Sequence, residues 1–329
     1  MKKVHTYVSI LLLLICFSCN NEPYDGDIII ETPTTGTPTD PTNPDPVNPN
    51  PTDPTTPGAS MQLADYDYIK TFTSTPGNET SFTADFVINA NNQFLAQNTT
   101  FTFLGTTVNG TANILRDENS RVTQVRTTVD GTIVNRTIVT YNLDKITEIR
   151  YEDLQDSSED YTFTFIHLNN VITRTKENTN STTKFTFDDT TNKLILRETM
   201  ENGNVVKTET ISYDTNGNLS SAVITGQDAN TFTYSYDTTA NPLLSSLNDL
   251  YLFSILNDEY DDQYEHWQAI IYSTNNVTSA NTLQGNSNLT IEYDASNRII
   301  SRNGTIFSSL PSISNDVTIT IDEQFQYIN

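Results

Sequence analysis

Residues 213–219 read Tyr-Asp-Thr-Asn-Gly-Asn-Leu, and this stretch joins two segments in which apolar and polar residues alternate. The aspartate can accept hydrogen bonds from backbone amides within the turn, and Asn-Gly adopts positive φ at little cost. Alternation with a period of two is typical of half-buried β-strands. The stretch therefore predicts a strand, a tight turn and a second strand.

The same turn pattern recurs along the chain. Residues 293–299 repeat it with the same spacing, residues 187–194 have one residue more, residues 141–146 have one fewer, and residues 165–171 form a degenerate copy. The aromatic residues that open the copies fall at 141, 165, 187, 213 and 236, so the period is 22 to 26 residues. A period of that length indicates one supersecondary unit that is repeated, and a hairpin fits it.

Alternating segments extend over most of the chain after residue 60. Their apolar positions carry Phe, Tyr, Ile and Val, and their polar positions carry mainly Thr. The segments are 99–104, 132–141, 160–165, 183–187, 231–236 and 317–321. This pattern predicts an all-β fold, an antiparallel meander of repeated hairpins. We expect a long twisted sheet that curls towards a partial barrel or a solenoid, and we expect charge and threonine to protect its open edges.

One segment departs from the alternation. Between 242 and 256, apolar residues stand at 243, 244, 247, 250 and 251, which is helical spacing. Asn241 and Pro242 have the residue types of an N-cap and a first helical position. The sequence predicts a short helical insertion at about 243–256 that packs over one end of the sheet.

The N-terminal residues 1–18 have the features of an export signal. Lys2 and Lys3 precede an apolar run at 8–17, which is too short to span a bilayer. Ser18 is a small residue directly before Cys19, so we predict cleavage between Ser18 and Cys19 and lipid attachment to Cys19. The alternative is an ordinary secretory signal with two incidental cysteines.

A proline-rich segment follows. Nine of the 13 prolines lie between residues 32 and 57, separated by Thr, Asn and Asp. This composition favours extended polyproline II, and 26 residues at about 3.1 Å each reach roughly 80 Å. We therefore divide the chain into a signal at 1–18, a lipidated cysteine with a disordered tether at 19–60, and a β-rich domain at 61–329.

Charge limits the partners. The chain has 41 acidic and 17 basic residues, and removal of residues 1–18 takes away Lys2 and Lys3 and no acid, which leaves a net charge of −26. Such a charge opposes binding to nucleic acid and to anionic lipid. The expected partners are the membrane, through the lipid anchor, and a glycan or protein ligand.

No catalytic motif is present. His167 falls in the degenerate repeat, where we interpret it as incidental, and His266 stands beside Trp267, the only tryptophan. We interpret Trp267 as a core or interface residue rather than a carbohydrate platform. The acidic cluster 258–262 lacks EF-hand spacing, so a solvated loop is favoured over a Ca²⁺ site, and 156–160 reads as an exposed hairpin tip. We assign no catalytic residue, no metal site and no cofactor.

The Tyr213–Leu219 stretch resembles the core of the YD repeat, also called the Rhs-type repeat, and 293–299 resembles it without the glycine. The resemblance covers about residues 120–305. The combination of the Cys19 motif, the polar tether and the repeats is similar to surface lipoproteins of the Bacteroidetes. This resemblance implies a β-repeat fold at the cell envelope, anchored by lipid in the outer membrane, on either of its faces.

The resemblance implies no reaction. The first hypothesis is a non-enzymatic binding or structural module displayed at the envelope. The alternatives are a glycan hydrolase that uses a carboxylate pair, and an accessory protein of a secretion or adhesion system. Two carboxyl groups about 5–10 Å apart in a concave groove would favour the hydrolase, whereas acids scattered over hairpin tips would favour binding or structure.

Overall fold

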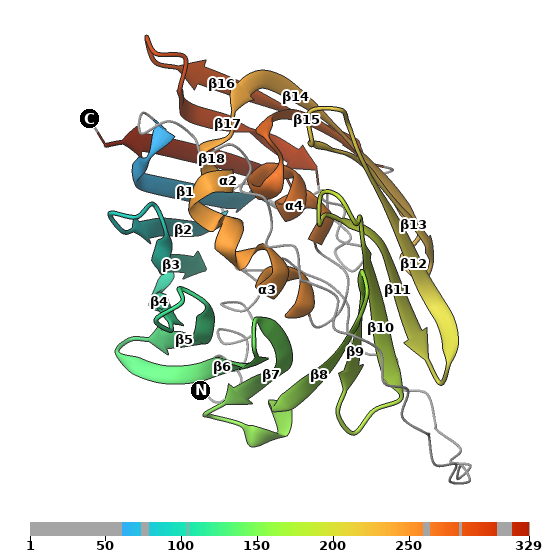
Figure 1. Cartoon of the computed structure of the whole chain (residues 1–329). Helices are drawn as coiled ribbons and strands as arrows, with labels where there is room; N and C mark the ends of the chain where they lie inside the picture. The colour runs from blue at the N-terminus through green and yellow to red at the C-terminus, as the bar shows by residue number, and fades with distance from the viewer. Residues whose placement is uncertain are drawn as a thin grey trace, which may run out of the picture.

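The computed structural model describes residues 61–73, 79–103, 105–258, 264–282, 285–307 and 318–328. These residues form 18 antiparallel strands, and each strand pairs with the next one along the chain. The last strand, β18, pairs with the first, β1, over Leu63–Thr73. The meander is therefore a closed barrel (Figure 1).

The strands of the barrel wall are 6 to 11 residues long. Their bounds are β1 Leu63–Thr73, β2 Glu79–Ile88, β3 Phe94–Phe103, β4 Thr106–Arg116, β5 Val122–Val129, β6 Thr132–Asn142, β7 Lys145–Asp153, β8 Tyr161–Leu168, β9 Val171–Lys176, β10 Ser181–Phe187, β11 Leu194–Glu201, β12 Asn204–Tyr213, β13 Leu219–Gly226, β14 Asn230–Ala240, β15 Asn275–Thr282, β16 Gly285–Tyr293, β17 Ile299–Phe307 and β18 Thr318–Tyr327.

The predicted all-β meander is confirmed, and its closure goes beyond the partial barrel that we expected. Because β1 pairs with β18, the described strands have no unpaired edge, so the expectation that charge and threonine protect open edges is wrong. Closure removes the edges altogether.

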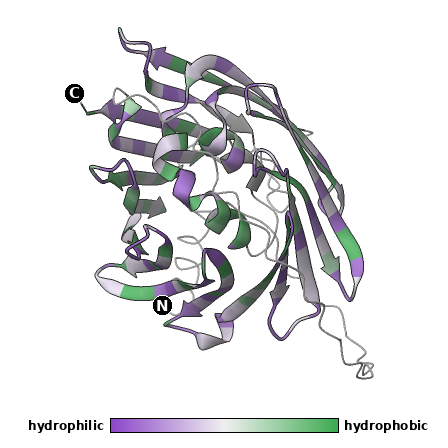
Figure 2. Cartoon of the chain, viewed as in Figure 1, coloured by the Kyte–Doolittle hydropathy of each residue, from purple (hydrophilic) through white to green (hydrophobic). Residues whose placement is uncertain are grey.

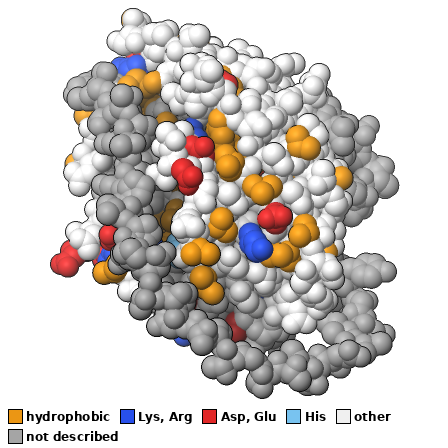
Figure 3. All heavy atoms as spheres, turned by 45° about the vertical axis from the view of Figure 1, so that its right-hand side comes forward, with side chains coloured by type: hydrophobic (Ala, Val, Ile, Leu, Met, Phe, Trp, Pro, Cys, Tyr) orange, Lys and Arg blue, Asp and Glu red, His pale blue; other side chains and the backbone are white. Residues whose placement is uncertain are grey.

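Alternation along most strands places mainly apolar side chains inside the barrel and mainly polar ones outside. In β18, Ile319, Ile321 and Phe325 are buried, whereas Thr318 and Thr320 are exposed. Hydropathy alternates in the same way along other strands (Figure 2). On the face that Figure 3 turns forward, hydrophobic side chains and a few charged ones are scattered among other side chains and backbone.

Three helices and two short 3₁₀ turns complete the described structure. They are η2 Ser157–Glu159, α2 Pro242–Leu247, η3 Asn248–Leu250, α3 Tyr251–Leu256 and α4 Tyr264–Tyr272. The predicted N-cap is confirmed, since the Asn241 side chain accepts a hydrogen bond from the backbone N–H of Leu243, with Pro242 in the first turn. Helix α4 was not predicted. Among the described helices, none is long and apolar enough to cross a bilayer.

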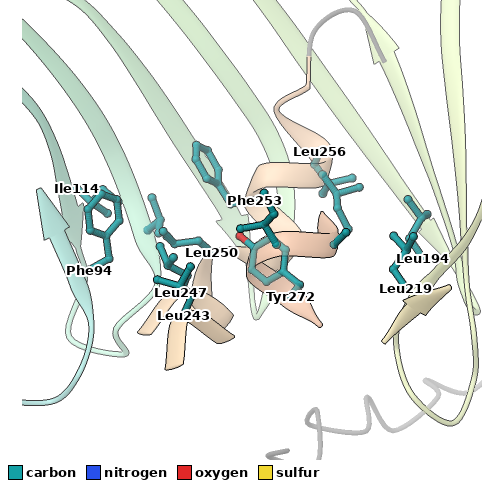
Figure 4. Packing of buried hydrophobic residues seen from close by; sticks show 14 of the residues in the cluster. Phe94, Ile114, Leu194, Leu219, Leu243, Leu247, Leu250, Phe253, Leu256 and Tyr272 are labelled. Carbon is teal, nitrogen blue, oxygen red and sulfur yellow. The ribbon is translucent and has the colours of Figure 1, made fainter. Parts of the chain in front are cut away.

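The helices α2–α4 lie inside one end of the barrel. Figure 4 shows Leu247, Leu250 and Phe253 between two sides of the wall, with Phe94 and Ile114 on one side and Leu194 and Leu219 on the other. All of these side chains belong to one buried hydrophobic cluster. We call this the helix end of the barrel. It also carries the turns that follow β2, β4, β6, β8, β10, β12 and β16, because alternate turns of a meander lie at the same end.

Candidate functional site: the helix end of the barrel

The turns at the helix end share one construction, which the YD-like repeat encodes. In Tyr213–Leu219, the Asp214 Oδ1 atom accepts hydrogen bonds from the backbone N–H groups of Asn216 and Asn218 at 2.8 and 2.9 Å. Gly217 has φ 85°, which explains the glycine. The strand after the turn then carries one unpaired residue, because Tyr213 pairs with Leu219 while Ser212 pairs with Ser221. Such a bulge increases the local twist of the strand.

Two copies of this turn were missed in the sequence. Asn89 accepts hydrogen bonds from the N–H groups of Asn91 and Gln93, and Asp117 accepts them from Asn119 and Arg121. Neither copy begins with an aromatic residue or contains glycine. Of the repeat pattern, each copy keeps only an Asn or Asp five residues before the apolar residue that begins the next strand: Asn89 before Phe94, and Asp117 before Val122.

The hydrogen bonds within the turns stabilise the charged form of their aspartates. Backbone N–H groups lower the pKa of Asp188, and the backbone N–H of Arg298 lowers the pKa of Asp294. The Arg298 side chain adds an Nε hydrogen bond of 2.7 Å to the same carboxylate. The carboxylates of these turns are therefore occupied in holding the backbone.

Basic side chains of the turns also lie over tyrosine rings of the next strand. The guanidinium carbons of Arg121 and Arg298 are 4.8 and 4.4 Å from the ring centroids of Tyr141 and Tyr327. The Lys193 Nζ atom is 4.8 Å from the Tyr213 ring. These cation–π contacts connect each turn to its neighbour around the barrel.

A row of tyrosine hydroxyls joins successive hairpins. The hydroxyl of each tyrosine donates to the carbonyl of the residue that restarts the preceding hairpin. The pairs are Tyr141 to Val122 at 2.9 Å, Tyr213 to Leu194 at 3.0 Å, Tyr236 to Leu219 at 2.6 Å and Tyr327 to Ile299 at 2.8 Å. The aromatic residue of the repeat therefore has a structural role that its apolar character did not reveal.

His167 takes the tyrosine position in one copy. Its Nε2 atom is 2.7 Å from the Ile146 carbonyl oxygen, and it pairs with Ile172 as Tyr141 pairs with Ile146. The copy predicted to begin at Phe165 therefore begins two residues later. The interpretation of His167 as incidental is wrong, because its ring makes the hydrogen bond that tyrosine makes elsewhere. Burial lowers the pKa of this imidazole.

The helical insertion is fixed to the wall on several sides. The Asn241 amide donates to the carbonyls of Ile270, Ile271 and Ser273 at 2.8, 3.1 and 3.0 Å. Arg116 of β4 forms an ion pair of 2.7 Å with Asp249 of η3. The Tyr251 hydroxyl accepts the backbone N–H of Leu194 at 2.9 Å. These contacts reach opposite sides of the barrel, so the insertion closes this end as a plug.

Charged side chains on the inner wall are held by one another. Arg197 donates to Glu209 at 2.5 Å and to Asp258 at 2.7 Å, and all three side chains are at most 4% exposed. The interpretation of 258–262 as a solvated loop is therefore wrong for Asp258, which is drawn inside by Arg197. Residues 259–262 lie outside the described residues.

A second buried pair lies where the barrel closes. Arg302 of β17 donates to both carboxylate oxygens of Glu323 of β18, at 2.6 and 2.7 Å, and the Tyr66 hydroxyl of β1 donates to the same carboxylate at 2.5 Å. Burial, followed by the negative charge of Glu323, raises the pKa of Tyr66 well above its ordinary value. The group connects the last two strands to the first.

Three carboxylates meet on the outer wall. Asp65, Asp67 and Asp85 have carboxylate oxygens within 4.8 Å of one another, and Asp67 stands directly opposite Asp85 across β1 and β2. Partial burial and the neighbouring Asp85 charge raise the pKa of Asp65. Exposed acidic groups of this kind are common without a bound ion, so the cluster is a place of like-charge repulsion.

The remaining predicted positions divide into two groups. Ser18 and Cys19 lie outside the described residues, as do the side chains of His266 and Trp267. The predicted hairpin tip at 156–160 is confirmed, since its residues are exposed and join β7 to β8.

Comparisons with known proteins give structural likenesses only. The sequence matches no family model and no curated protein. The fold is similar to the crystal structure of a porin-like protein from Bacteroides uniformis, with a TM-score of 0.45, 13% identity, and coverage of 81% of this chain and 98% of that chain. It is also similar to the Tc holotoxin pore of Photorhabdus luminescens, with a TM-score of 0.27, 11% identity and 73% of this chain covered. The likeness spans 14% of that toxin chain.

Proposed function

We propose that this chain is an exported envelope lipoprotein, anchored through Cys19, whose plugged barrel serves as a non-enzymatic binding or structural module. The observation that carries the second part is the state of the carboxylates. The inward acids Glu209, Asp258 and Glu323 are buried in arginine ion pairs, and the other acids of the described residues lie mainly on turns and on the outer wall. A hydrolase needs two accessible carboxyl groups that flank a substrate.

The outer wall supports the first part of the proposal. Many exposed side chains of the described strands are Thr, Ser, Asn or charged residues, which water solvates and hydrocarbon does not; large apolar side chains such as Leu95 and Val223 are scattered among them. A barrel with such a wall reaches a membrane through another part of its chain. Cys19 and the tether at 19–60 supply that connection in the proposal.

The anchor is tested by acylation in cells. With labelled palmitate, we expect incorporation into the wild-type protein and none into Cys19→Ala, because Cys19 is the proposed acceptor of the lipid. Cys16→Ala is the matched control, since it removes the other cysteine of the sequence, and it should be labelled like the wild type. Equal labelling of the wild type and Cys19→Ala would contradict the anchor.

The accessory-protein alternative has no specific support among the described residues. The binding role is tested with the whole acylated chain in detergent on a glycan array and in pull-downs from outer-membrane extracts. Specific retention of a glycan or a protein supports a binding module. Release of a cleaved glycan product would instead contradict the non-enzymatic assignment.

A further inference from the structure

Among the described residues, the large apolar side chains with the highest exposed fractions lie at one place on the helix end. Leu143, Ile166 and Leu168 are 82%, 70% and 69% exposed, whereas the other exposed large apolar residues are near 50% or below. Leu143 forms the turn between β6 and β7, and Ile166 and Leu168 are at the end of β8. We call these three residues the rim patch.

The strand register makes the rim patch continuous. Glu148 of β7 pairs with Thr164 of β8 in an antiparallel arrangement. Continuation of this register towards the helix end brings Ile166 and Leu168 beside the first residues of β7 and the turn that contains Leu143. The three side chains therefore belong to one surface at the barrel rim.

The backbone at Leu143 gives a second, independent indication. Leu143 has φ 54°, in the left-handed region that disfavours most side chains other than glycine, asparagine and aspartate. The matching first position of other short turns holds Asp130, Asn169 or Asn202. A leucine here is unfavourable both in its backbone conformation and in its exposure, and such outliers are found where a surface has a function.

Charge around the rim patch is locally balanced, although the chain as a whole carries −24. Arg121 is paired with both Asp144 at 3.2 Å and Asp117 at 2.7 Å, its guanidinium also donates to the Leu143 carbonyl, and Lys145 adds a second positive charge beside Asp144. The turn after β8 is Asn169-Asn170, which has no charge. A neutral apolar rim suits contact with an uncharged lipid surface better than the acidic turns do.

The tether leaves from the same end. β1 begins at Leu63, whose backbone N–H donates to Asn92 in the β2–β3 turn at the helix end. The 44 residues from Cys19 to Gln62 therefore connect the anchor to the end that carries the rim patch. We propose that the rim patch rests in the interface of the bilayer that holds the lipid anchor, an inference that depends on the proposed anchoring at Cys19.

The test uses the acylated protein in phosphatidylcholine vesicles. In the proposed mature chain the only thiol is Cys19, which lipid blocks, so one introduced cysteine can be labelled with an environment-sensitive fluorophore. We expect the probe at Leu143→Cys to shift its emission to the blue and to be quenched by lipids that carry a doxyl group. The matched control is Leu154→Cys, an exposed leucine at the opposite end of the barrel, whose probe should remain in water.

A second variant tests the patch itself. Ile166→Thr and Leu168→Thr place on the outer wall the residue that is common there, so the fold is retained. In this background, the probe at residue 143 should lose most of its quenching. Equal, water-like emission at residues 143 and 154 in proteins that keep Ile166 and Leu168 would overturn the proposal.

Flotation of the vesicles separates this proposal from the one on which it depends. Protein that floats while its residue 143 probe stays in water overturns the rim contact and leaves the anchor intact. Protein that fails to float, like Cys19→Ala, overturns the anchor and with it the rim contact.

Discussion

At the residue scale, the recurring feature is a hydrogen bond from a side-chain donor to a backbone carbonyl of the preceding hairpin. Tyr141, Tyr213, Tyr236 and Tyr327 use a hydroxyl, and His167 uses a ring nitrogen. The hydrogen bond satisfies a carbonyl at the point where a bulge disturbs the strand ladder. This explains why aromatic residues with a polar atom are favoured at a position that phenylalanine could also fill.

Because one of these donors is His167, the free energy of unfolding should depend on pH. Burial lowers the pKa of His167 in the fold from 6.5, so the folded protein disfavours the charged imidazole. Stability should therefore be complete above pH 6.5 and should fall as the pH drops towards the folded pKa. We expect His167→Tyr to retain the hydrogen bond to Ile146 and to unfold with less dependence on pH between 7 and 5, in urea titrations compared with the wild type.

The reciprocal change provides the control. Tyr141→His places an imidazole at the equivalent position. This variant should lose additional stability on acidification, as the wild type does through His167. A pH profile of His167→Tyr that coincides with that of the wild type would show that this imidazole does not titrate differently in the two states.

At the element scale, the helical insertion depends on one buried amide. Asn241 is 3% exposed; its oxygen caps α2, and its nitrogen donates to the carbonyls of Ile270 and Ile271 in the last turn of α4 and of Ser273 just after it. It therefore joins the start of the insertion to its end. Directly before Asn241, Ala240 of β14 pairs with Asn275 of β15. Asn241 therefore stands where the insertion leaves the wall and close to where it rejoins it.

Removal of this amide should loosen the plug. Asn241→Ala loses the cap and leaves buried carbonyls without donors, so we expect a decrease of about 3 kcal/mol in the free energy of unfolding. Ser245→Ala is the control in the same helix: it removes a partly buried hydroxyl that donates to the Pro242 carbonyl and accepts from the Asn92 amide, and it should cost about 1–2 kcal/mol. An Asn241→Ala protein within about 0.5 kcal/mol of the wild type in urea unfolding would contradict this role.

Sequence reasoning at this scale succeeded where signals are local. The turn at 213–219, the alternating strands and the N-cap at Asn241 each depend on a few adjacent residues. Helix α4 was missed because Tyr264–Tyr272 is short and rich in aromatic and β-branched residues, which also suit strands. The turns at Asn89 and Asp117 could not be predicted from the repeat pattern, because that pattern begins with an aromatic residue that they lack.

At the scale of the whole molecule, the fold depends on contacts that no local pattern contains. Tyr66 and Glu323 are 257 residues apart and meet where β1 closes on β18. The Arg197–Asp258 pair, 61 residues apart, likewise could not be found from spacing. An acidic cluster in a sequence gives no information on which of its members an arginine will draw into the interior.

The contributions of Tyr66, Arg302 and Glu323 to the free energy of unfolding should be strongly coupled. Arg302→Met alone leaves Glu323 charged and buried, so we expect a loss of about 3–5 kcal/mol. Replacement of the whole group, with Arg302→Met, Glu323→Leu and Tyr66→Phe together, should cost much less, because no charge or hydroxyl is left unpaired. Additive losses in chemical denaturation of the single, double and triple variants would contradict this coupling.

β1 and β18 are hydrogen-bonded to each other like any other neighbouring strands of the barrel. The closed barrel therefore does not require the chain to begin and end between these two strands. A circular permutant, with Tyr327 linked to Leu63 and the chain opened at the Asp130-Gly131 hairpin, would keep all strand pairs. The proposed tether would then leave from the end opposite the helices. If the chain is anchored through Cys19 as we propose, the natural order of the strands sets which end of the barrel faces the membrane.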